Sequence, residues 1–130
     1  MINEDKIMNS QALTGIFGCV PAFIGSELMD IRIRSFKRTI VIQLMTTQPV
    51  QNKPKRWDKW DVVYIEISLF DIRDLVISGD VSTNSIIQFD LREAEKEGLL
   101  EIKCNNQMQI KCSFDWARVE QVTPGLIGTP

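Results

Sequence analysis

The chain has 130 residues, of which 44% are apolar and 25% charged, and its formal net charge is −2. This length predicts a single domain over residues 1–130 that buries a core without disulfide bonds. Because no run of 18 residues is apolar and the acidic N-terminus is unlike a signal peptide, the sequence argues against a membrane protein and favours a cytoplasmic one. Histidine is absent, which removes the commonest general base and metal ligand.

A short helix is predicted near the N-terminus, over residues 9–18. Asn9-Ser10 can cap its start, apolar residues follow at helical spacing, and Gly18 is placed to end it. Pro21 and Gly25 then hold the chain in a turn.

From Leu28 onward the hydrophobic period changes from 3.6 to 2, which indicates strands. Residues 29–33 and 40–44 each place apolar side chains on one face, and an even-numbered loop at 35–38 brings the two faces together. The predicted register pairs Ile33 with Ile40, Ile31 with Ile42 and Met29 with Leu44.

Residues 46–59 are a predicted loop that is rich in polar residues, proline and basic residues. Three strand segments are expected after it, and Gly79 stops the second of them. The inward residues of the first segment are Val63, Ile65, Ile67 and Leu69. The second segment holds Leu75-Val76-Ile77, and the third has apolar residues at the alternate positions Ile87, Phe89 and Leu91. The charged run 92–97 is interpreted as a solvated connector that Gly98 closes.

The last hairpin joins two segments whose apolar residues all have even numbers, from Leu100 to Cys104 and from Met108 to Phe114. A three-residue loop with an Asn in the left-handed conformation is therefore predicted at 105–107. In that register Cys104 opposes Met108 and Cys112 opposes Leu100, so the two sulfurs are too far apart for a bond and are expected as reduced core thiols. A final strand lies around 116–122 and ends at Pro124-Gly125, and residues 1–8 and 125–130 are expected to be loose tails.

The elements add up to about eight strands and one short N-terminal helix. Successive antiparallel hairpins predict a mainly β (α+β) fold, an antiparallel β-sandwich or bent meander whose helix covers one edge or face.

Charge is unevenly distributed along the chain. Residues 32–59 hold eight basic residues and one acid, whereas residues 61–101 hold ten acids and three bases. Two interpretations are open: either two sheet surfaces simply differ in the sign of their charge, or a bipolar surface attracts a charged protein partner. In the second interpretation a basic partner would contact an acidic surface made of Asp71, Asp74, Asp80, Asp90, Glu93, Glu95 and Glu97. The basic stretch is short in a net acidic chain, so nucleic acid is not the expected partner.

Trp57 and Trp60 lie at the end of the basic loop, next to Arg56. They either cover the end of the sheet or contribute an aromatic contact to a partner, since Trp and Arg dominate interface hot spots.

No catalytic, cofactor-binding or metal-ligating set is predicted. Phosphate loops, nucleophile elbows and metal-spaced cysteines are absent from the sequence. Carboxylates do occur in pairs, Asp58 with Asp61 and Asp71 with Asp74, and a hydrolase alternative would require at least two of them in one deep pocket.

The segment Phe17-Gly18-Cys19-Val20-Pro21-Ala22-Phe23-Ile24-Gly25-Ser26-Glu27-Leu28, followed by an alternating strand, resembles the opening of the bacterial immunity protein 50 family of polymorphic toxin systems. The chain keeps Phe17, Gly18, Pro21, Phe23 and Glu27 of that pattern. It departs at Cys19-Val20, where the family has aromatics, and at Ile24-Gly25, where the family has His-Asp. Residues 70–75, 84–87 and 112–124 are similar to later segments of the family.

The resemblance implies an immunity protein that binds and neutralises a cognate toxin protein, with no cofactor and no catalytic group. The five matching residues are interpreted as fold-forming, with Phe17, Pro21 and Phe23 docking the helix onto the first hairpin and Glu27 bonding turn amides. A homodimer is compatible with this assignment. The alternative is a non-catalytic interaction or accessory domain of a bacterial regulatory or secretion system.

Overall fold

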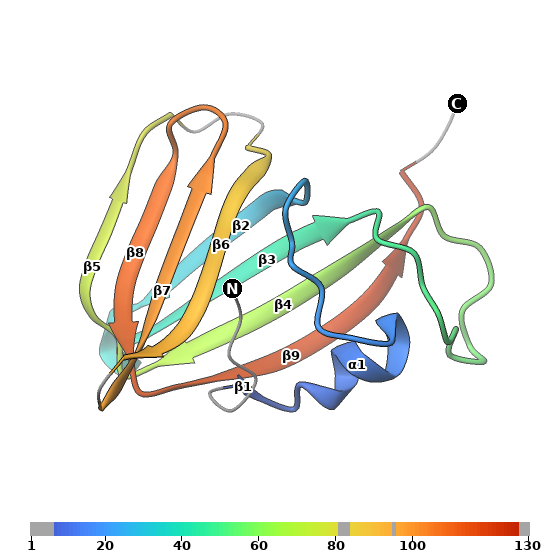
Figure 1. Cartoon of the computed structure of the whole chain (residues 1–130), viewed down its shortest axis with the longest axis horizontal. Helices are drawn as coiled ribbons and strands as arrows, with labels where there is room; N and C mark the ends of the chain where they lie inside the picture. The colour runs from blue at the N-terminus through green and yellow to red at the C-terminus, as the bar shows by residue number, and fades with distance from the viewer. Residues whose placement is uncertain (1–6, 81–83, 95, 128–130) are drawn as a thin grey trace.

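The computed structural model describes residues 7–80, 84–94 and 96–127, with only the backbone of residues 93 and 94. The described residues form nine strands in two sheets, together with a seven-residue helix α1 (Gln11–Phe17) and a 3-10 turn η2 (Ser35–Lys37) (Figure 1). The five-stranded sheet has the order β1 (Ile7–Met8), β9 (Trp116–Gly125), β4 (Val62–Phe70), β3 (Thr39–Thr46) and β2 (Glu27–Arg34). The four-stranded sheet has the order β5 (Arg73–Ser78), β8 (Gln109–Phe114), β7 (Glu97–Cys104) and β6 (Ile86–Ala94).

One hydrophobic core lies between the sheets. The alternate residues of β3 and β4 that face inward join those of β6, β7 and β8 in a single buried cluster, and Leu13 and Phe17 of α1 belong to the same cluster. The helix and the four-stranded sheet therefore cover the same face of the five-stranded sheet. This confirms the predicted mainly β, sandwich-like fold with one N-terminal helix.

The helix ends as predicted. Gly18 has φ 84°, the left-handed conformation that glycine adopts at low cost, and its N–H donates to the Thr14 carbonyl at 2.9 Å. Ser10 occupies the N-cap without a side-chain cap bond. Asn9 instead donates from Nδ2 to the Val119 carbonyl at 3.0 Å, which ties the start of the helix to β9.

The first hairpin has the predicted register only in part. Ile33 pairs with Ile40 and Ile31 with Ile42, which confirms two of the three predicted pairs. The third is wrong, because a β-bulge between Leu28 and Asp30 makes Leu28 the partner of Leu44. An extra residue in one strand turns the side chains that follow it, and Met29 is 46% exposed.

A second bulge explains the error at Ile87. The register of β6 shifts between Ile86 and Gln88, so that Ile86 is buried and Ile87 is exposed, while Phe89 and Leu91 face inward as predicted.

The prediction of a solvated connector over residues 92–97 is wrong, because the residues on both sides of the turn belong to a β-hairpin. Residues 92–94 continue β6, and Glu97 and Gly98 already belong to β7. Gly98 does not close a loop there; the ring of Phe114 lies where a Cβ of Gly98 would be.

The last hairpin confirms the predicted pairing. Leu100 pairs with Cys112, and the Cys104 N–H donates to the Met108 carbonyl at 2.8 Å. The left-handed residue of the loop is Gln107, with φ 66°, rather than an Asn. Both cysteines are buried and reduced, as expected.

Parts of both predicted tails are paired. Ile7–Met8 forms β1, which runs parallel to β9, and Ile7 is buried. Pro124 and Gly125 continue β9 opposite Val63 and Val62. Residues 1–6 and 128–130 lie outside the described residues.

The segment that carries the family resemblance connects the two sheets. The Gly25 N–H donates to the Ile86 carbonyl at 2.8 Å, and the Ile86 N–H donates to the Ser26 carbonyl at 2.7 Å. Phe23 packs edge-to-face on Phe89 of β6, with ring centroids 4.9 Å apart. The segment therefore contacts β6 through Phe23, while α1 lies against β9, and Phe17 and Phe23 share one core cluster with Ile40, Ile42 and Leu44 of the first hairpin.

Candidate protein-binding surfaces

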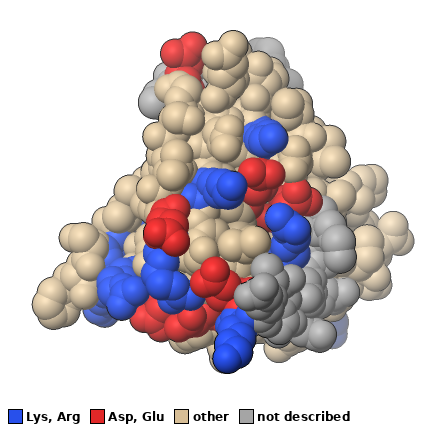
Figure 2. Space-filling model, turned by 60° about the vertical axis from the view of Figure 1, so that its left-hand side comes forward, with Lys and Arg blue, Asp and Glu red and all other residues tan. Residues whose placement is uncertain are grey.

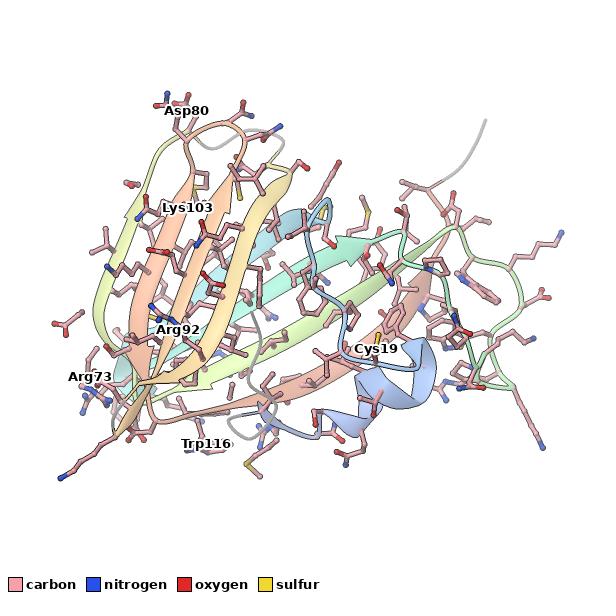
Figure 3. The ribbon with its side chains drawn as sticks, viewed as in Figure 1. Cys19, Arg73, Asp80, Arg92, Lys103 and Trp116 are labelled. Atoms are coloured by element: carbon pink, nitrogen blue, oxygen red, sulfur yellow. The ribbon has the colours of Figure 1, made fainter. Side chains whose placement is uncertain are left out.

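The predicted acidic surface is divided among several places. Asp80 lies at the free end of the four-stranded sheet, whereas Arg73, which binds Glu97, lies at the other end where the two sheets meet (Figure 3). Asp90 lies between them, on the outward face of β6.

The remaining members of the set are also separate. Asp71 and Asp74 flank Arg73, and both have positive φ, 55° and 52°. Glu93 is described by its backbone alone, in β6, and Glu95 lies outside the described residues.

Arg73 forms ion pairs with two carboxylates, of which only Glu97 belongs to the predicted acidic surface. The Arg73 guanidinium contacts Glu97 at 3.1 Å and Asp115 at 2.9 Å and donates to the Asp71 carbonyl at 2.8 Å. The hydrogen bonds to Glu97 and Asp115 raise the pKa of Arg73. This cluster holds the β4–β5 turn against the ends of β7 and β8.

The outer face of the four-stranded sheet carries charges of both signs. Asp90 faces Glu101 across β6 and β7, and Glu101 in turn faces Lys111 of β8. Gln88 donates from Nε2 to Asp90 at 2.6 Å and to Glu101 at 3.1 Å, so an amide lies between the two carboxylates. Figure 2, which brings the β5 side forward, shows basic and acidic side chains interspersed rather than gathered by sign. Arg92 and Lys103 project from the same sheet (Figure 3).

The two tryptophans differ in depth. Trp57 is 2% exposed and belongs to the core, whereas Trp60 is half-buried and packs edge-to-face on it with ring centroids 5.5 Å apart. The loop that carries them is tied to α1, because the Gln51 and Asn52 N–H groups both donate to the Ile16 carbonyl. Trp57 therefore closes the end of the core, and Trp60 and the exposed Arg56 remain at the surface.

A third surface was not predicted. The outer face of the five-stranded sheet contains a hollow of about 270 Å³, called the outer hollow below. Its lining comes from β2, β3, β4, β9 and the β2–β3 turn: Arg34, Lys37, Thr39, Val41, Glu66, Ser68, Phe70, Arg118, Glu120 and Gln121.

The register explains the shape of the outer hollow. Val41 and Ser68 face each other at the centre of the sheet, with Arg118 beside Ser68 and Thr39 beside Phe70. Thr39, Val41 and Ser68 have small side chains that form the floor of the hollow, and each of these residues is 5% exposed or less. The long side chains around them form the walls.

An aromatic and cationic cluster borders the outer hollow. Phe70 and Trp116 stack with ring centroids 4.0 Å apart and planes 16° from parallel. The Arg118 guanidinium lies 5.1 Å from the centre of the Phe70 ring and 5.8 Å from that of Trp116, within the range of a cation–π interaction.

A protein-family comparison gives a match over most of the chain. The model of the family described as Immunity protein 50 matches residues 9–125. The chain belongs to the immunity protein 50 family. No curated protein and no solved structure matches it.

The described part of this immunity protein 50 family member shows no arrangement for carboxylate catalysis. Asp58 and Asp61 precede β4, and Asp71 and Asp74 follow it, so the two pairs lie at opposite ends of a nine-residue strand. None of the four lines the outer hollow. Among the described residues no group of three or more His, Cys, Asp or Glu side chains could hold a metal ion. The helices in the described ranges are too short to cross a lipid bilayer.

Sequence reasoning found the charge of the outer hollow but not its place. Arg34 and Lys37 belong to the basic stretch 32–59, yet their partners in the wall, Phe70 and Arg118, come from strands far along the chain. The alternation of β9 could have pointed to Trp116 and Arg118 as outward residues.

Proposed function

We propose that this protein is an immunity protein that binds and neutralises a cognate bacterial toxin domain by a stoichiometric protein–protein interaction. The observation that carries the proposal is the match of the Immunity protein 50 family model to residues 9–125. The protein acts in the cytoplasm of the producing cell, and its partner is a protein rather than nucleic acid.

The described structure supports inhibition by contact. Two sheet faces and a loop present arginine, lysine and aromatic side chains on a well-packed scaffold. A binding protein requires such a rigid surface and no reacting group, because affinity comes from complementary contacts with little rearrangement.

The test uses the toxin domain encoded beside the gene for this chain. We expect the purified proteins to form a complex at micromolar concentration, and we expect co-expression to restore growth of cells that make the toxin. Absence of both the complex and the protection contradicts the proposed function. A neighbouring gene without any toxin-like domain would favour the accessory-domain alternative.

A further inference from the structure

We propose that the outer hollow and the adjoining Phe70–Trp116 stack are the surface that binds the toxin, and that the toxin presents an acidic patch there. This inference rests on the proposed function and identifies the contact surface and the chemistry of the partner. It replaces the predicted acidic surface as the main contact.

The first argument is the balance of charge on this face. Arg32 forms ion pairs with Glu66 and, at 3.5 Å, with Asp30, and Arg118 pairs with Glu120 at 2.7 Å. These pairs neutralise every carboxylate that lines the outer hollow.

Three cations remain after that pairing. Within the described part of the chain, Arg34, Lys37 and Arg38 have no carboxylate at ion-pair distance, and all three are exposed. Arg34 and Lys37 line the hollow, and Arg38 follows them in the same turn. The face therefore carries an excess of positive charge, and an acidic partner supplies the missing counter-charges.

The second argument is the shape. A floor of Thr39, Val41 and Ser68, in the middle of a sheet, leaves room for side chains of a partner between longer walls. A volume of about 270 Å³ accommodates one or two carboxylate side chains. Their oxygens would accept from the Arg34 guanidinium, which can bind a carboxylate in bidentate fashion.

The third argument is the aromatic stack. Phe70 and Trp116 lie on an outer sheet face that no described element covers, so these two large aromatic side chains remain partly exposed to solvent. Aromatic and arginine side chains dominate the energy of protein interfaces when they meet at the centre of a contact. The stack and Arg118 give the proposed interface an apolar centre beside the cationic hollow.

The outer face of the four-stranded sheet provides the contrast. Strand pairing sets Lys111 opposite Glu101, and Gln88 links Glu101 to Asp90, so carboxylates lie among the cations of this face. A hollow at its β6–β7–β8 end is lined by one cation, Lys103, and otherwise by uncharged residues. A partner that is selected by charge gains less from this face.

The experiment compares two double charge reversals in the full chain. Arg34→Glu with Lys37→Glu changes the outer hollow, and Lys103→Glu with Lys111→Glu makes the same change of charge on the four-stranded sheet. The dissociation constant for the adjacently encoded toxin domain is measured for both variants and for the unmodified protein. Thermal unfolding of each variant checks that the fold is intact.

We expect the outer-hollow variant to raise the dissociation constant at least about 100-fold, because it sets like charges against the acidic patch. The control variant should change it less than about threefold. Binding of the unmodified protein should also weaken as salt rises, since screening reduces the attraction between exposed charges.

Failure of the inference differs from failure of the proposed function. If the unmodified protein binds and protects but the outer-hollow variant does so equally well, or the control variant is the weaker one, another surface is the contact and the proposed function stands. If the unmodified protein neither binds nor protects, both are wrong. If the outer-hollow variant loses binding to a short duplex DNA and keeps its affinity for the toxin, the face serves nucleic acid, and the inference is overturned.

Discussion

Segment 17–28 and the outer hollow lie on opposite sides of the five-stranded sheet and differ in almost every property. In segment 17–28 the residues that resemble the family are mostly buried: Phe17 and Phe23 are each 3% exposed, and Pro21 is buried too. The outer hollow is made of long, mostly charged side chains that are exposed or half-buried, over a small-residue floor. One region identifies the family and stabilises the fold, and the other is the surface we propose for the partner.

The difference teaches that the residues by which a chain is recognised need not be those with which it binds. Segment 17–28 has a demanding structural role, since it bonds to residues 84–86 and thereby connects the two sheets. Few residue types satisfy those conditions. A docking surface needs only complementarity to one partner, so the residue types that it carries depend on the surface of that partner and not on the fold. The predictions below test this separation, from the largest expected effect to the smallest.

The first prediction tests whether Phe23, a residue of segment 17–28, stabilises the fold without contacting the toxin. Phe23→Ala removes a ring that packs on Phe89 in the core, so we expect the free energy of unfolding to fall by about 3–5 kcal/mol. The affinity of the folded fraction for the toxin should be unchanged. Denaturant unfolding and a titration at low temperature measure the two quantities.

Phe36 offers the matched control, because its side chain is 95% exposed at the β2–β3 turn. Phe36→Ala should change the stability by about 0.5 kcal/mol or less. Equal losses of stability in the two variants would show that Phe23 is not a core residue.

The two buried cysteines of the core predict that the free energy of unfolding depends on pH. Burial raises the pKa of the Cys112 thiol to about 11 and raises that of Cys104 as well. Between about pH 9 and pH 11 the unfolded thiol loses its proton while the folded thiol keeps it, so stability falls as pH rises. We expect Cys112 to contribute a loss of about 2 kcal/mol across this range.

Unfolding in denaturant at a series of pH values measures this loss. Cys112→Ala should show a smaller decrease between pH 9 and pH 11 than the unmodified protein. A decrease of the same size in both proteins would assign it to other groups.

The exposed Cys19 of segment 17–28 should react with a thiol reagent without unfolding.

The role of the aromatic stack can be sharpened with one substitution. Trp116→Ala leaves Phe70 and Arg118 without their partner at the border of the outer hollow. We expect the dissociation constant for the toxin to rise about tenfold, in keeping with a contributing hot-spot residue. Trp60→Ala, in the loop at the far end of β4, is the control and should change the dissociation constant less than about twofold. If Trp60→Ala weakens binding more than Trp116→Ala does, the contact lies at that loop.

The smallest effects concern two glycines that both have room for a Cβ but differ in backbone conformation. Neither Gly15 nor Gly25 has an atom within 4 Å of the place where a Cβ would be, but Gly25 has φ 89° and Gly15 is helical. Gly15→Ala should therefore stabilise the protein by about 0.5–1 kcal/mol, and Gly25→Ala should destabilise it by about 1–2 kcal/mol. Thermal unfolding compares them, and the same sign for both would mean that the turn at Gly25 can relax.

Much of the fold followed from the sequence because local rules determined it. The helix end at Gly18, the register of Ile31 and Ile33 and the three-residue loop at 105–107 depend on period, parity and turn chemistry. Met29 and Ile87 were placed wrongly because bulges interrupt the alternation there. Residues 25–28 bond to residues 84–86 at both bulges, and such a long-range contact leaves no trace in a hydrophobic pattern.

The candidate surface was harder to predict than the fold. A run of acidic residues along the chain suggested an acidic surface, but Arg73 and Gln88 bind several of those carboxylates and strand pairing places lysines among them. The depth of Trp57 depends on how its loop folds back onto α1, which spacing does not determine. The stack of Phe70 on Trp116 requires β9 to lie beside β4, which is a property of the topology.

The position of β9 has a consequence for when the protein becomes active. This last strand is an interior strand of its sheet, between β1 and β4, and Asn9 bonds to Val119 across 110 residues of sequence. Neither the five-stranded sheet nor the wall of the outer hollow that Arg118 provides can form until residues 116–125 have left the ribosome. Such distant pairing also folds slowly. If the proposed function holds, protection should therefore lag behind synthesis of the chain, and a cell would need a reserve of finished molecules before it meets the toxin.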